Sequence, residues 1–116
     1  PPPGTAAIAQ RPGTRHSIMI GAPGIAIQSA LTEQEWADCG LAEPRRPEAR
    51  RAARQGFATS RNEVVPGLSS VAVPLRLPGH PPAALAVVSL AAAKASPGPV
   101  AERLRLAADR IRAEVE

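Results

Sequence analysis

The chain has few of the residues on which cross-linking, metal binding and base stacking depend. Its 116 residues include one Cys, one Trp, one Phe and no Tyr. A single cysteine excludes an intrachain disulfide and a cysteine-based metal site. Nucleic-acid bases stack on aromatic platforms, which this composition does not supply, so the sequence disfavours direct base recognition.

Long apolar runs are also missing. No run approaches the roughly 18 residues that a membrane-spanning helix needs, and no segment resembles a signal peptide. We therefore expect a cytoplasmic protein that has no membrane partner. The first residue is Pro rather than Met, so we expect the chain to have been processed or excised from a longer one.

Arginine supplies nearly all of the positive charge of the chain. Lys94 is the only lysine among 14 basic residues, and the net charge is +4. This balance is compatible with nucleic-acid binding, but no helix-turn-helix, zinc-finger or RNA-recognition pattern accompanies it. Arg50, Arg51 and Arg54 would share one side of a helix, where they either attract phosphates or form a solvated face. The length fits one domain over residues 1–116, with residues 1–4 as a frayed lead-in.

The centre of the sequence predicts a β-hairpin. Residues 68–76 and 83–90 are short runs rich in Val and Leu, and such runs are typical of strands. The prolines between them favour a turn over a continuous strand. Alternation places Ser70 and Ala72 on one face of the first strand. We expect this face, with its small side chains and hydroxyls, to hold any ligand.

Other segments predict helices and shorter strands. Residues 32–35 (TEQE) form a capping box, which begins a short helix that we expect to end at Gly40. Further helices are expected at residues 25–31 and 47–55, and strands at residues 5–11 and 57–61. Ser96 is the expected N-cap of a final helix. Its predicted apolar stripe consists of Val100, Leu104, Ala107, Ala108, Ile111 and Val115.

A glycine-rich stretch, residues 21–24 (GAPG), precedes the first of these helices. Free amides at a helix start attract a ligand carboxylate. Alternatively, the glycines only allow the chain and the helix to pack closely. This stretch alone does not decide between the two interpretations.

No pattern in the sequence indicates catalysis. His16 and His80 lie in expected connections and have no Cys, Asp or Glu at metal-ligand spacing. The sequence has no G-x-S-x-G motif and no Walker or dinucleotide-binding glycine pattern. We therefore expect no catalytic residue, no metal and no cofactor.

Several of these stretches together resemble the effector-binding domain of IclR-type transcriptional regulators. The likeness is carried by residues 54–58 (RQGFA), Glu63, residues 66–76 (PGLSSVAVPLR) and residues 84–89 (ALAVVS), with Ser96-Pro97 at the last helix and residues 12–26 before the first. It covers nearly the whole chain. The family pattern has a Cys where Ser70 stands.

The resemblance implies a GAF-like α+β fold, in which an antiparallel sheet is flanked by helices. Here the fold would be truncated at its N-terminal side and would lack the helix-turn-helix domain through which such regulators bind DNA. The implied partners are a small organic effector, of a carboxylic or aromatic kind, and further copies of the chain in a homo-oligomer. Effector binding would modulate DNA binding by the parent protein.

The resemblance also implies a ligand site between the sheet and the first helix. By position, its residues are Ile20, Gly21, Ala22, Ser70, Ala72, Val87 and Ser89. Two alternatives stay open: the serines bond only within the sheet, and the domain is a dimerisation scaffold with a vestigial pocket.

Overall fold

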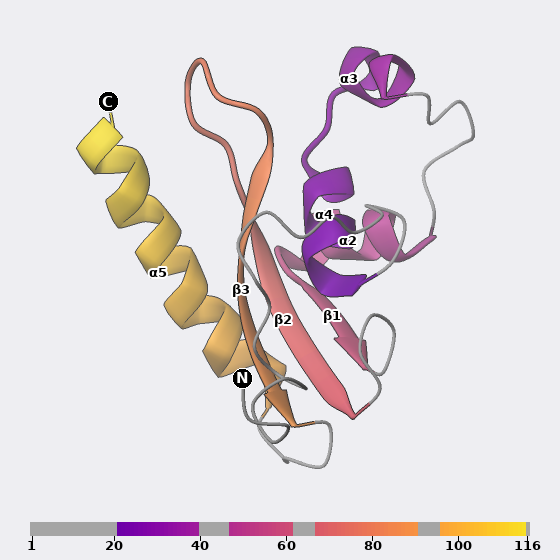
Figure 1. Ribbon diagram of the computed structural model, residues 1–116, viewed down its shortest axis with the longest axis vertical. Coiled ribbons are helices and arrows are strands. Elements are labelled where there is room, and N and C mark those ends of the chain that lie inside the picture. The colour runs from indigo at the N-terminus through magenta and orange to yellow at the C-terminus, as the bar shows by residue number, and fades with distance from the viewer. Residues whose placement is uncertain (1–20, 40–46, 62–66, 91–95, 116) are drawn as a thin grey trace, which may run out of the picture.

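The computed structural model describes residues 21–39, 47–61, 67–90 and 96–115. Figure 1 shows a central sheet with one long helix on one side and a group of shorter helices on the other. The α+β arrangement that the sequence predicts, an antiparallel sheet flanked by helices, is confirmed. The lead-in at residues 1–4 and the strand expected at residues 5–11 lie outside the described residues.

Within the described residues, the sheet has three antiparallel strands, β1 (Ala58–Arg61), β2 (Leu68–Leu75) and β3 (Ala83–Leu90), in that order. The predicted hairpin is confirmed, although β2 ends one residue earlier than expected. At its tip the N–H of His80 donates to the Leu77 carbonyl at 3.1 Å. Gly79 has φ of 73°, so Pro78 and Gly79 form the centre of a type II turn.

One face of the sheet packs against α2 (Gly21–Ser29), which in turn contacts α4 (Pro47–Gln55). The core on this side consists almost wholly of small residues: Ala22, Ile25, Ala26, Ala52, Ala58 and Ala72. Small side chains allow α2 to approach the sheet closely. The sequence predicted a flexible stretch at residues 21–24 that opens onto a helix at residues 25–31, with Pro23 in its first turn, where no hydrogen-bond donor is lost. The helix does include Pro23, but it begins at Gly21 and ends at Ser29.

The other face packs against α5 (Pro97–Val115). Leu104, Ala101 and Ala108 are buried against Val73 and Leu75 of β2. The predicted stripe is confirmed in its middle part and wrong at its end. Val115 is 46% exposed, whereas Ala101, which the stripe omitted, is buried. None of the described helices is both long and apolar enough to cross a membrane.

The short helix α3 (Glu33–Asp38) begins with the predicted capping box. Thr32 Oγ1 accepts from the Glu35 N–H at 3.1 Å, and the Thr32 N–H donates to Glu35 Oε1 at 2.9 Å. The helix ends at Asp38, two residues before the expected Gly40. Trp36 is buried.

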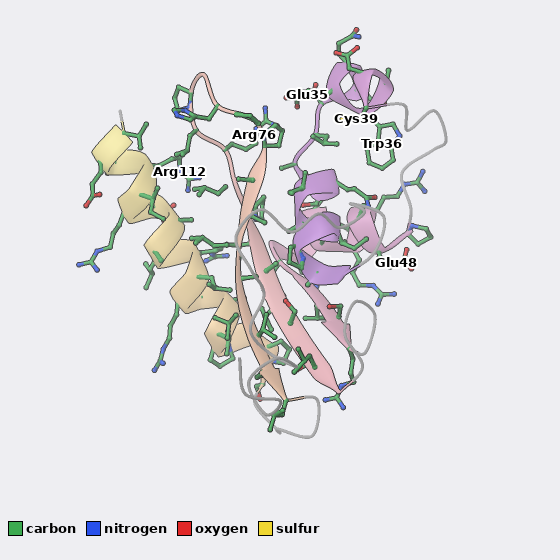
Figure 2. All side chains as sticks on the ribbon, viewed as in Figure 1. Glu35, Trp36, Cys39, Glu48, Arg76 and Arg112 are labelled. Carbon is green, nitrogen blue, oxygen red and sulfur yellow. The ribbon has the colours of Figure 1, made fainter. Side chains whose placement is uncertain are left out.

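The Glu35 carboxylate also binds Arg76, which follows β2. Arg76 Nη1 and Nη2 donate to Glu35 Oε1 and Oε2 at 3.0 and 2.7 Å, and Figure 2 shows the two side chains between α3 and the hairpin. These hydrogen bonds, with that from the Thr32 N–H, lower the pKa of Glu35 from 4.5 to about 2. The pair ties α3 to a segment 41 residues away.

This ion pair makes stability depend on pH in a defined range. Because the folded-state pKa of Glu35 is lowered from 4.5 to about 2, its contribution to stability is complete above 4.5 and is lost as the pH falls toward 2. The difference in unfolding free energy between the wild type and Glu35→Gln should therefore be constant above about pH 6 and shrink below about pH 4.5. Urea unfolding at several pH values measures it.

The Gln variant is suited to this test because Gln keeps the carbonyl oxygen that closes the capping box. A carboxyl NMR titration gives the pKa of Glu35 directly. Arg76→Gln should raise that pKa toward its ordinary value, although not fully, since the Thr32 N–H still donates. An ordinary Glu35 pKa in the wild type would contradict the ion pair.

Two leucines of α5 test which of its faces is buried. Leu104 is 8% exposed and Leu106 is 57% exposed. Leu104→Ala should lower the unfolding free energy by about 2–5 kcal/mol, because it leaves a cavity against β2. Leu106→Ala, the matched control, should change it by less than about 0.5 kcal/mol. Equal effects of the two substitutions would show that α5 is rotated from this arrangement.

Candidate functional site

The strand register separates the predicted site residues onto two faces of the sheet. Ser69 pairs with Ser89, and Ser70 pairs with Val88. Directly paired residues of antiparallel strands project to the same face, so Ser70 and Ser89 project to opposite faces. The prediction that both serines share one face of the sheet is therefore wrong, although both residues line one groove. Alternation divides the side chains of each strand between two faces. Which face of one strand continues which face of its neighbour depends on the register, and a register shift of one residue reverses the match.

On the α2 face, four residues form a group that we call the serine cradle: Gly21, Ala22, Ser60 and Ser70. The Ala22 N–H donates to Ser60 Oγ at 3.0 Å. Ser60 on β1 is paired directly with Ser70 on β2. Ser70 Oγ is buried and has no hydrogen-bond partner among the described residues.

The backbone of Gly21 sets the position of this helix start. Its φ is 83°, in the left-handed region that favours glycine. The chain thereby turns so that the first amides of α2 face the serines of the sheet. Ala72, which is completely buried, lies in the same core cluster as Ala22. Four predicted site residues thus gather on this face: Gly21, Ala22, Ser70 and Ala72.

Ser60 is the site residue that the sequence analysis missed. It lies two positions after Ala58, which is buried beneath α2. Alternation along the predicted strand at residues 57–61 would have placed it on the same face as Ala58. No local pattern indicates that Ser60 contacts Ala22, because Ala22 lies 38 residues earlier in the chain. Ile20, also predicted, lies outside the described residues.

The remaining two predicted residues, Val87 and Ser89, lie at a groove on the α5 face. Its volume is about 450 Å³. Its described lining residues are Thr59, Ser60, Arg61, Ser69, Ser70, Val71, Val87, Ser89, Ser96, Pro97 and Val100. Within it, the hydroxyls of Ser69 and Ser89 form a hydrogen bond of 3.1 Å. The alternative that the serines bond within the sheet therefore holds for Ser89.

The described residues offer no arrangement for metal or nucleophilic chemistry. They contain no group of three or more His, Cys, Asp or Glu side chains that could hold a metal ion. Cys39 is exposed at the end of α3. His80 is exposed at the hairpin tip, where its Nδ1 lies 2.9 Å from the Pro78 carbonyl oxygen. The three arginines of α4 (Arg50, Arg51, Arg54) are exposed as well.

Sequence comparisons identify no relative of the chain. No protein-family model matches it, and no curated protein matches it. Structural comparison is more informative, because fold is retained after sequence similarity is lost. The similar structures below are regulators of one kind.

The repressor BlcR from Agobacterium tumefaciens matches with a TM-score of 0.76 and 17% identity, over 93% of this chain and 51% of its own. An IclR transcriptional regulator from Alicyclobacillus acidocaldarius matches with a TM-score of 0.74 and 19% identity, over 94% of this chain and 50% of its own. An IclR homolog from Microbacterium hydrocarbonoxydans, complexed with 4-hydroxybenzoate, matches with a TM-score of 0.69 and 22% identity, over 93% of this chain and 50% of its own.

The chain thus spans about half the length of each of these structures. At these identities the likeness concerns the fold. It agrees with the motif resemblance in the sequence. The chain has the fold of about one half of an IclR-type transcriptional regulator, as the motifs predicted.

Proposed function

We propose that this chain is the ligand-sensing regulatory domain of an IclR-type transcriptional regulator in the cytoplasm. It binds a small organic acid in the serine cradle, and binding alters how the parent protein binds DNA through a helix-turn-helix domain. The role is regulatory rather than enzymatic. The shared fold supports this proposal, as does the complex of one similar IclR homolog with 4-hydroxybenzoate.

The proposal that the serine cradle is the ligand site rests on one observation. The buried hydroxyl of Ser70 has no hydrogen-bond partner among the described residues. Leaving a polar group buried and unpaired costs about 1–3 kcal/mol. A ligand oxygen that accepts from this hydroxyl removes that cost. A carboxylate is the strongest acceptor for it, because hydrogen bonds to charged groups are shorter and stronger than neutral ones.

The position of α2 links binding to a structural change. Ala22 N–H is already bound to Ser60 Oγ at 3.0 Å, directly beside Ser70 in the register. A carboxylate that takes the Ala22 N–H and the Ser70 hydroxyl replaces Ser60 and displaces the first turn of α2. Since α2 contacts all three described strands and α4, the displacement reaches much of this face. Binding then shifts the population between two packings, which is what regulation requires.

Ser70→Ala tests the site, with 4-hydroxybenzoate as the first probe and other small organic acids beside it. The substitution should weaken binding about tenfold, equivalent to about 1.4 kcal/mol. It should leave the unfolding free energy of the unliganded protein unchanged or raise it, because an unpaired buried hydroxyl is removed. Calorimetric titration and urea unfolding give the two quantities.

Ser29→Ala is the matched control. It also removes one serine hydroxyl beside α2, but this hydroxyl donates to the Ala26 carbonyl at 2.6 Å. It should not change the affinity for the acid. If the folded wild type binds none of the acids, or if Ser70→Ala binds as well as the wild type, the cradle is not the sensing site.

A second candidate function, a dimerisation scaffold, is favoured by apolar residues exposed on β3. Val88 and Leu90 are 53% and 63% exposed, and β3 lies at one edge of the described sheet. An edge strand with apolar side chains readily pairs with another chain. The partner in that case is β3 of a second copy, which makes the chain a homo-oligomer.

Light scattering after gel filtration tests this scaffold function. Leu90→Asp should convert an oligomer to a monomer, because it introduces a charge at the proposed contact. Leu106→Asp, at a similarly exposed leucine of α5 (57%), should leave the mass unchanged. A wild type that is monomeric at about 1 mM would exclude the scaffold, since a stable dimer binds much more tightly than that.

A further inference from the structure

The groove on the α5 face combines polar and apolar walls. Hydroxyl groups of Thr59, Ser69 and Ser89 occupy one part of its lining, and Val71, Val87 and Val100 supply apolar surface. Its volume of about 450 Å³ lies within the range of roughly 300–1,000 Å³ that is typical of small-molecule sites. Seven of its eleven described lining residues are Ser, Thr or Arg, so the groove is more polar than most such sites and suits a ligand with a charged or hydrogen-bonding group.

The groove carries positive charge without a compensating acid. Arg61 belongs to its lining, whereas no Asp or Glu is among the described lining residues. Within the part of the chain that the structure describes, no carboxylate lies within ion-pair distance of Arg61. Glu102 on the nearby helix α5 is bound to Arg105 at 2.6 Å. Among the described residues, no acid therefore occupies the donors of this guanidinium.

The start of α5 adds to this potential. Ser96 and Pro97 line the groove, and the first turn of this helix contains no acidic residue. The positive end of the helix dipole is thus not neutralised by its own side chains. Several lining residues, including Arg61, Ser89 and Ser96, are exposed, so a ligand enters without the displacement that the cradle requires.

We propose that this groove is a second binding site, separate from the serine cradle, which takes a small carboxylate with an apolar body. The carboxylate pairs with Arg61 and accepts from the hydroxyls of the sheet. The apolar body lies against Val71, Val87 and Val100. This site does not depend on the proposed sensing function, because the side chains that it uses (Thr59, Arg61, Ser69 and Ser89) belong to the face opposite the cradle. Ser60 and Ser70 border both sites.

Benzoate and benzamide are the probes, since they share shape and differ in charge. A titration of the ¹⁵N-labelled chain, followed by NMR, should show benzoate shifting the amides of Arg61, Ser69 and Ser89 more than that of Ala22. Benzamide should bind at least tenfold more weakly. Raising the salt concentration from about 0.02 to about 0.5 M should weaken benzoate binding, because salt screens an exposed charge pair.

Arg61→Gln should weaken benzoate binding about tenfold, whereas Arg54→Gln, an exposed arginine on α4, should not change it. The dispersion of the NMR spectrum checks that both variants are folded. The proposal of a carboxylate site in the groove is overturned if benzoate shifts none of the amides of its lining residues, if benzamide binds as well as benzoate, or if Arg61→Gln leaves benzoate affinity unchanged. The comparison of benzoate with benzamide uses the wild type alone, so it decides the question even if Arg61→Gln fails to fold. Benzoate shifts at Ala22 with none at Arg61, Ser69 or Ser89 would also overturn the proposed groove site while supporting the cradle.

Discussion

The burial of β2 on both of its faces is the constraint on which the rest of this structure depends. Ala72 is fully buried beneath α2, and the next residue, Val73, is 1% exposed beneath α5. The alternation of the strand therefore gives each layer its own character. Small residues face α2 and allow close approach, while branched residues face α5 and fill a wider core. Any shift of β2 by one residue would exchange the two surfaces and leave neither helix with a matching partner.

The same alternation divides the polar groups of the sheet between two environments. Ser70 lies on the close-packed side, where its hydroxyl is buried without a partner in the described structure. Ser69 lies on the open side, where its hydroxyl meets that of Ser89 at 3.1 Å. Two adjacent residues of one type thus differ in what they offer a ligand. The buried one has an unmet hydrogen bond that binding can satisfy, whereas the other belongs to an accessible groove beside a cation.

Much of this fold could be predicted from the sequence because its signals are local. Pro47–Gln55 and Ala83–Leu90 have the bounds that the sequence predicted, and the capping box of Thr32 and Glu35 forms as expected. The long-range features could not be predicted in this way. Neither the contact of Ala22 with Ser60 nor that of Arg76 with Glu35 leaves a local pattern, since 38 and 41 residues separate the partners. The prediction that Ser89 shares a face with Ser70 was wrong for the same reason, because the register is a property of two paired strands and not of one strand.

A structure of the chain with bound 4-hydroxybenzoate would show whether the serine cradle is the sensing site. We expect a carboxylate oxygen within hydrogen-bond distance of both Ser70 Oγ and the Ala22 amide, with the first turn of α2 moved away from Ser60. A ligand bound elsewhere, with the Ala22–Ser60 hydrogen bond intact and Ser70 Oγ still without a partner, would contradict this expectation.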